Sequence, residues 1–81
     1  TGRIFVFLTG WTGTRSGNIT MDVQTSANGT SGWSTEASFS FNAKDAKSAV
    51  FSSPAGAYFN VNVTSLGGTS GVTFTVIVVI D

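Results

Sequence analysis

The sequence contains no cysteine, no histidine and a single proline among its 81 residues. Without cysteine the chain has no disulfide to stabilise a small fold, and without cysteine and histidine a conventional zinc site is excluded. The same absences remove the Ser-His-Asp and Cys-His arrangements, because a serine nucleophile needs a base to activate it. We therefore expect no metal site, no cofactor and no enzymatic activity.

Charge is also scarce, since charged residues make up 10% of the chain and the formal net charge is zero. In ordinary soluble domains, about a quarter of all residues are charged. Four scattered basic residues do not form the cationic surface that binds nucleic acid. The apolar run at residues 72–80 (VTFTVIVVI) is far shorter than the ~20 residues of a membrane-spanning helix. We expect neither nucleic acid as a partner nor a membrane span.

Two carboxylates and two lysines are the charged candidates for a catalytic role. Asp22 and Glu36 fall on the outward faces of successive predicted strands, where we expect no cleft. The paired carboxylates of a glycosidase must lie on either side of a bound sugar. Lys44 and Lys47 belong to the charged segment 43–47 (AKDAK), which we expect to be a solvated turn or a single helical turn. A lysine base needs a buried site. None of the four indicates catalysis.

The abundance of Thr, Ser, Val, Phe and Gly favours strands and turns over helices. Short strands separated by polar turns at roughly 8 to 12 residue spacing are typical of an antiparallel β-sandwich. We therefore predict one domain over residues 1–81, an all-β sandwich of Greek-key or jelly-roll type with six or seven strands, and a small closed β-barrel as the alternative. The clearest segments are 2–9, 18–25, 33–42, 48–52 ending before Pro54, 57–64 and 72–80.

Two of these strands break the alternation of apolar and polar residues. In RIFVFL and TVIVVI, consecutive residues are apolar, so both faces of the strand favour burial. Either these are central strands whose outer face is covered by a loop, or they pack against another chain. Under the second interpretation, the candidate assembly interface consists of Phe5, Phe7, Ile77 and Val79.

Three aromatic residues are candidates for contact with a glycan. Trp11 and Trp33 adjoin Gly-rich polar loops. Tyr58 belongs to the outward-facing set of the alternating segment 57–64. Exposed aromatic side chains beside polar groups are suited to stacking and hydrogen bonding. A tryptophan at the start of a strand also serves as a lid on the core, so both interpretations stay open for these residues.

The order of these features is similar to that in a known group of proteins. The first strand RIFVFLTGW is followed by ITMDVQTS, by an Asn-Gly turn running to a tryptophan, and by SPAGAYFNVNVTSLGGTSGVTFTV. This arrangement resembles small β-sandwich virion proteins of tailed bacteriophages, of the capsid decoration, head-fibre or tail-fibre type. In that family a similar turn to a tryptophan precedes a strand of the pattern paG-x-y-r-v-n-v-t, where this chain has Phe59 at a position that is often charged.

The resemblance implies a non-enzymatic structural protein of an extracellular virion. It implies many copies, binding to the major capsid protein or a tail protein, and loops presented to host surface glycans. With the apolar strand faces, it leads us to expect a homo-oligomer, such as a trimer, that acts as a capsid decoration (cement) or fibre component. Two alternatives stay open: a carbohydrate- or receptor-binding β-sandwich module that uses the three aromatics, and a secreted or pilus-like subunit that exchanges strands between chains.

Overall fold

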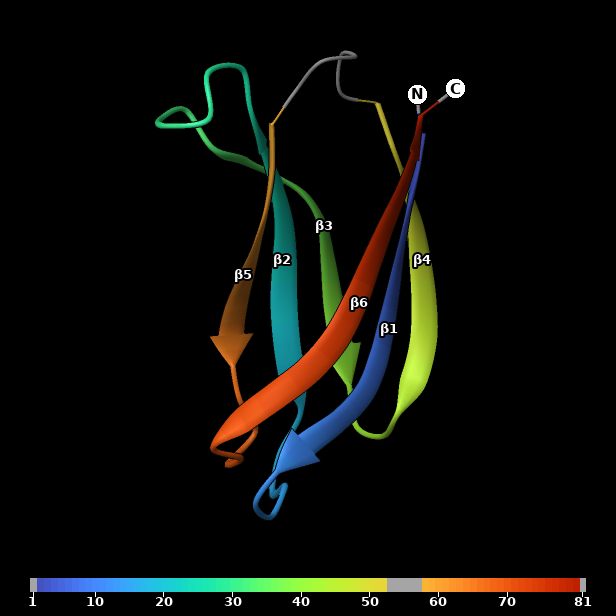
Figure 1. Ribbon diagram of the computed structural model, residues 1–81, viewed down its shortest axis with the longest axis vertical. Coiled ribbons are helices and arrows are strands. Elements are labelled where there is room, and N and C mark those ends of the chain that lie inside the picture. Colours follow the sequence, from blue (N-terminus) through green and yellow to red (C-terminus); the bar gives the residue numbers. More distant parts are fainter. Residues whose placement is uncertain (1, 53–57, 81) are drawn as a thin grey trace.

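The computed structural model describes residues 2–52 and 58–80, and within them it consists of strands and connecting loops without a helix. Pro54, which we expected to end a strand, lies outside the described residues. The strands run side by side along the long axis of an elongated molecule (Figure 1). Their bounds are β1 (Gly2–Thr12), β2 (Ile19–Ser26), β3 (Ser34–Phe41), β4 (Asp45–Phe51), β5 (Tyr58–Ser65) and β6 (Gly71–Ile80).

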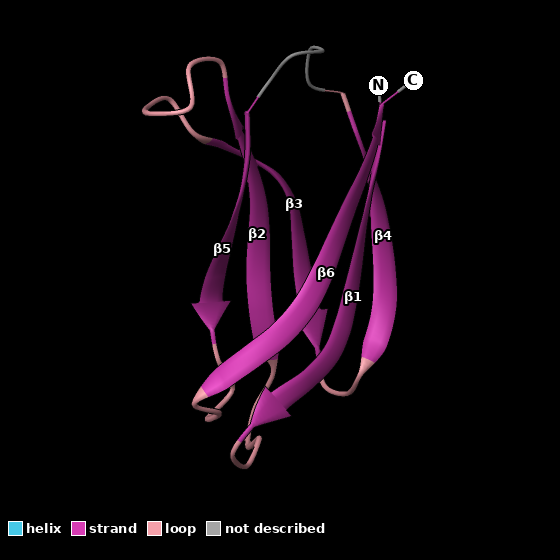
Figure 2. Cartoon of the chain, viewed as in Figure 1, coloured by secondary structure: helices cyan, strands magenta, loops and turns pink. Residues whose placement is uncertain are grey.

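The strands form two three-stranded antiparallel sheets that pack against each other (Figure 2). Sheet A has the order β4-β1-β6, and sheet B has the order β3-β2-β5. Among the described strands that follow one another in the chain, only β2 and β3 pair with each other, so the other connections cross between the sheets. The predicted antiparallel sandwich is confirmed. The closed barrel is wrong, because each sheet keeps two free edges.

One predicted boundary is wrong. We expected the segment 43–47 to be a turn, but β4 begins at Asp45, and Asp45 and Lys47 pair with Leu8 and Val6 of β1. Strand propensity depends strongly on the neighbouring strands, and here pairing with β1 outweighs the weak local preference. Charged residues are also common on edge strands, which β4 is. The turn is therefore shorter than predicted and ends at Lys44.

The core lies between the two central strands. Inward-facing residues of β1 and β2 are fully buried, and each contributes about 1.5 to 3 kcal/mol through removal of its apolar surface from water. Three phenylalanines of β3 and β4 complete this buried cluster. Its members are Ile4, Val6, Leu8, Ile19, Met21, Val23, Phe39, Phe41 and Phe51.

The end of the sandwich opposite the chain termini is held by the turn at Gly67 and Gly68. The Gly67 carbonyl accepts hydrogen bonds from the backbone N–H groups of Ser16 (2.7 Å) and Gly17 (3.0 Å). Gly67 has a φ of 64°, and a Cβ there would lie 2.6 Å from the Gly17 carbonyl oxygen. Only glycine fits this position without strain. The turn thus ties the β1–β2 connection to the β5–β6 connection.

Candidate functional site

The face of sheet A that is turned away from sheet B is mainly apolar. Because strand residues alternate between faces, the outward set can be read from the pairing of β1 with β4 and β6. We call this set the apolar outer face. Its rows, each read from β4 through β1 to β6, are Val50, Arg3 and Val79; Ser48, Phe5 and Ile77; and Ala46, Phe7 and Thr75.

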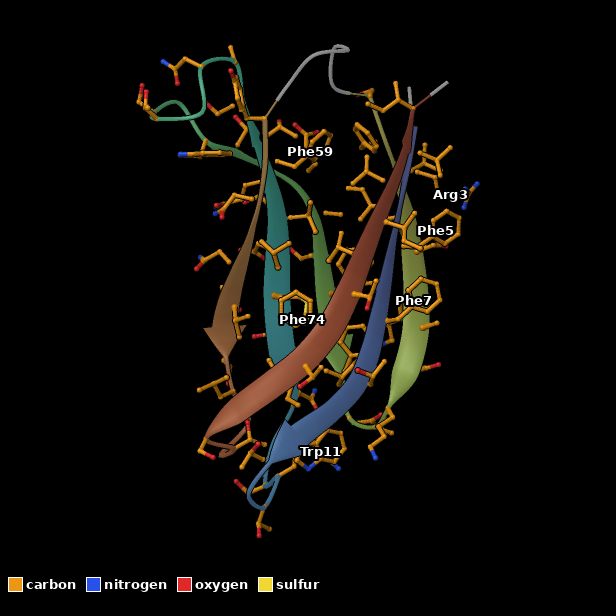
Figure 3. The ribbon with its side chains drawn as sticks, viewed as in Figure 1. Arg3, Phe5, Phe7, Trp11, Phe59 and Phe74 are labelled. Carbon is orange, nitrogen blue, oxygen red and sulfur yellow. The ribbon has the colours of Figure 1, made fainter. Side chains whose placement is uncertain are left out.

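The residues predicted for an assembly interface all lie on this face. Phe5 and Phe7 come from β1 and are half-buried, whereas Ile77 and Val79 of β6 are 47% and 45% exposed. Figure 3 shows Phe5 and Phe7 projecting from the side of the sandwich, away from the interior that holds Phe59 and Phe74. With this much exposure, the interpretation that a loop covers the outer side of these strands does not apply to the described residues.

These side chains are close enough to form one continuous patch. Residues directly opposite on neighbouring strands have Cβ atoms about 4.5 to 5.5 Å apart, so Phe5 lies beside Ile77 and Arg3 beside Val79. Contiguous exposed apolar patches on small proteins mark sites of interaction. The patch therefore has the property that an assembly interface requires.

Val50 belongs to the same face, although sequence reasoning missed it. It is 62% exposed and lies opposite Arg3. In the short segment 48–52, apolar and polar residues do not alternate clearly. Only the register with β1 therefore shows on which face Val50 lies. Arg3 is exposed and forms no ion pair with any residue that the structure describes.

The outer face of sheet B is polar in contrast. Its side chains form hydrogen bonds with one another across the strands, which reduces their need for any outside partner. The bonds join Ser38 Oγ to Asp22 Oδ1 at 2.8 Å, Asn60 Nδ2 to Gln24 Oε1 at 3.2 Å, and the Thr20 and Thr64 hydroxyls at 2.6 Å. One side of the sandwich is therefore apolar and the other is suited to water.

The carboxylates of Asp22 and Glu36 accept hydrogen bonds from different partners. Asp22 accepts from Ser38, while Glu36 accepts from Thr25 Oγ1 at 2.6 Å beside the bulge between β2 and β3. In the described part of the chain, no group of three or more His, Cys, Asp or Glu side chains is placed to hold a metal ion. Neither observation adds a catalytic or metal-binding role.

Trp11 lies at the end of the sandwich that also holds the 13–18 loop (Figure 3). The Arg15 Cζ atom lies over its ring at 5.7 Å from the centroid, and the Lys44 Nζ atom lies over it at 5.9 Å. Both are within the range of favourable cation–π contact. Side chains of the same chain thus occupy positions over the indole where a stacked sugar ring would have to lie.

The other two candidate glycan contacts lie at the opposite end of sheet B. Tyr58 is 56% exposed and pairs with Ser26 at the end of β2. Trp33 is half-buried and directly precedes Ser34, which pairs with Thr25. The three aromatics predicted from the sequence therefore do not form a single site.

No helix in the described residues has the length and apolar character to cross a membrane. Comparisons of the chain with protein-family models, with curated proteins and with solved structures give no match. The resemblance to virion proteins of tailed phages stays a prediction. The structure itself shows a sandwich with one mainly apolar and one polar outer face.

Proposed function

We propose that this protein is a non-enzymatic structural subunit that assembles in many copies through the apolar outer face of sheet A. This proposal is carried by one observation: on the apolar outer face, the half-buried Phe5 and Phe7 of the central strand are flanked by exposed apolar residues of both neighbouring strands. These residues are Val50 of β4 and Ile77 and Val79 of β6. A monomer that kept this face in water would lose the free energy of its burial, about 25 cal/mol per Å² of apolar area.

We further propose that the site of assembly is a tailed-phage virion, with the subunit acting as a capsid decoration (cement) or fibre component. The sequence resemblance supports this location, and so does the contrast between the faces. A subunit on the surface of a particle needs one face for the major capsid protein, a tail protein or its own copies, and another that stays wetted. The apolar face of sheet A and the hydrogen-bonded polar face of sheet B meet these two needs.

The alternatives receive less support. A subunit that exchanges its terminal strand would leave that strand without a partner in its own chain, but β6 pairs with β1 along its length. A glycan-binding module based on Trp11, Trp33 and Tyr58 would bring them together, but Trp11 lies at the other end of the sandwich from the remaining two.

Sedimentation velocity of the unmodified chain tests the proposal. We expect the weight-average sedimentation coefficient to rise with protein concentration through the micromolar range, as subunits associate by burial of the apolar outer face. Addition of salt is expected to leave this rise in place, because the interface is mainly apolar and salt screens only charge interactions. A chain that sediments as a stable monomer throughout this range contradicts self-assembly.

A further inference from the structure

The edge of β6 lacks the features that normally protect an edge strand. In the described part of the chain β6 pairs only with β1, which leaves its other edge free. The strand has ten residues, none charged and none proline, and after Gly71 every residue except Phe74 is β-branched. Natural edge strands usually carry a charged residue, a proline or a bulge that prevents pairing with another strand. The bulge in the β1–β6 ladder falls between Leu8 and Gly10 of β1.

The opposite side of the sandwich shows the usual protection. Its edge strands β3 and β4 carry Glu36, Asp45 and Lys47. The Lys47 ammonium donates a hydrogen bond to the Ser40 carbonyl of the other sheet and lies 5.2 Å from the Phe41 ring centroid. From Ser48 to Ile80, by contrast, the sequence contains no charged residue. Among the described residues, the edge strands β3 and β4 therefore carry charged side chains, whereas β5 and β6 carry none.

Burial of the inward-facing residues shows the same asymmetry. On the β3–β4 side, Phe39, Phe41 and Phe51 are buried. On the β5–β6 side, the inward residues are only half-buried, although they pack against the core. Figure 1 shows β5 and β6 joined by a short turn and diverging from it toward the other end of the sandwich. These half-buried residues are Phe59, Val61, Val63, Val72, Phe74, Val76 and Val78.

We infer that β6 pairs with β6 of a second copy of the chain, antiparallel and about a two-fold axis. The result is one continuous six-stranded sheet with the order β4-β1-β6-β6-β1-β4. Edge-to-edge addition of a strand supplies the main-chain hydrogen bonds that a free edge lacks. This contact is distinct from the apolar outer face and does not depend on assembly through that face.

The sequence of β6 is complementary to itself in this arrangement. A two-fold axis centred on Thr75, next to the middle of the strand, pairs residues an even number of positions apart. Inward residues then lie opposite inward residues, and outward residues lie opposite outward ones. No like charges meet, because the strand has none. An isologous contact of this kind also satisfies both free edges at once.

The free edge of β5 is a weaker candidate for the same contact. It has eight residues against ten, and its outward positions include Asn60 and Asn62, which are less favourable in strands. Pairing through β6 also places the apolar outer faces of two copies side by side on one continuous sheet, because Ile77 and Val79 of that face belong to β6. The dimer would then present a patch of twice the area to a scaffold.

The absence of cysteine makes a disulfide-trapping experiment direct. Thr75→Cys, Val79→Cys and Ser48→Cys each introduce one thiol on the outer side of sheet A, the last on the β4 edge as a control. With the axis on Thr75, a rise of about 3.4 Å per residue and a spacing of about 4.8 Å between strands place the two Thr75 positions about 5 Å apart across the axis. The two Val79 positions and the two Ser48 positions then each lie roughly 27 Å apart. Only the first separation permits a disulfide.

Mild oxidation of the purified chain is therefore expected to convert Thr75→Cys to a covalent dimer at least about tenfold faster than the other two variants. Equal rates for all three would overturn the inference, as would fastest dimerisation of Ser48→Cys, because either result places the contact elsewhere. Failure of Thr75→Cys to form a dimer in the concentration range where the chain associates would also overturn it.

A charge at the same position gives a second, non-covalent test. In Thr75→Lys, two lysines come close to each other across the axis, and we expect the dissociation constant of the dimer to rise at least about tenfold. Ser48→Lys adds the same charge to the apolar outer face at the β4 edge, so it is expected to weaken assembly through that face but to leave the dissociation constant of the β6 dimer within about threefold. A Thr75→Lys chain that is folded by circular dichroism and still dimerises like the unmodified chain overturns the inference.

Combination with an outer-face substitution separates this contact from the proposed function. If Thr75→Cys still forms covalent dimers when Phe5 and Val50 of the apolar outer face are replaced by serine, the β6 contact is independent of that face. If dimerisation is lost in that variant while its fold is intact, the contact runs through the outer face and the β6 inference is wrong, while the proposed function stands.

Discussion

Replacement of both Phe7 and Ile77 by serine is expected to abolish higher-order assembly while the sandwich stays folded. Phe7 is half-buried and Ile77 is 47% exposed, so both bury much of their surface only when a partner covers them. Full burial of such side chains contributes about 1.5 to 3 kcal/mol each, and loss of two amounts to a weakening of roughly a hundredfold or more per contact. Sedimentation velocity with circular dichroism measures association and folding in the same samples.

A matched pair on the other side of the molecule serves as the control. Asn60→Ser and Asn62→Ser change two exposed residues on the polar outer face of sheet B. We expect this chain to assemble like the unmodified protein. If the Phe7 and Ile77 variant assembles normally, or if both double variants lose assembly alike, the apolar outer face is not the interface.

The largest effect on folding is expected for Phe41→Ala. Phe41 is 1% exposed and is the largest of the fully buried side chains, and the Lys47 ammonium lies over its ring. Truncation of a buried phenylalanine costs about 3 to 5 kcal/mol through lost transfer free energy and the cavity left behind. Since a domain of this size is stable by only about 4 to 12 kcal/mol, a large part of its stability would be lost.

Phe7→Ala is the matched control, because the chemical change is the same but the residue faces outward. We expect it to reduce the unfolding free energy by about 1 kcal/mol, well below the effect at Phe41. Urea denaturation of dilute protein, followed by circular dichroism, gives both values under conditions where association is minimal. Similar losses at the two positions would show that Phe7 belongs to the folding core and not to an interface.

The alternation in β5 was sufficient to predict which side of that strand faces the core. Phe59, Val61 and Val63 face inward, and Tyr58 and Asn60 are exposed, as expected. Alternation does not indicate the place of a strand in its sheet, however. The inward residues of the edge strand β5 are half-buried and those of the central strand β2 are fully buried, a difference that the alternation does not predict.

The two strands with apolar residues on both sides show the same limit. Sequence alone does not distinguish β1 from β6, but β1 is central, with Phe5 partly shielded by both neighbouring strands, and β6 is an edge strand. The register that places Val50 beside Arg3 joins residues far apart in the chain, and so does the contact of Trp11 with Lys44. Such contacts follow from the pairing of strands, which short-range patterns do not specify.

The central claim, that the apolar outer face is covered by other subunits, is tested most directly by hydroxyl-radical footprinting of the dilute and the associated protein. We expect Phe5, Phe7 and Ile77 to lose most of their reactivity on association, because a partner excludes water from them. Tyr58 is 56% exposed on the other sheet and should react equally in both states. Unchanged reactivity of Phe5, Phe7 and Ile77 in the associated protein would contradict the claim.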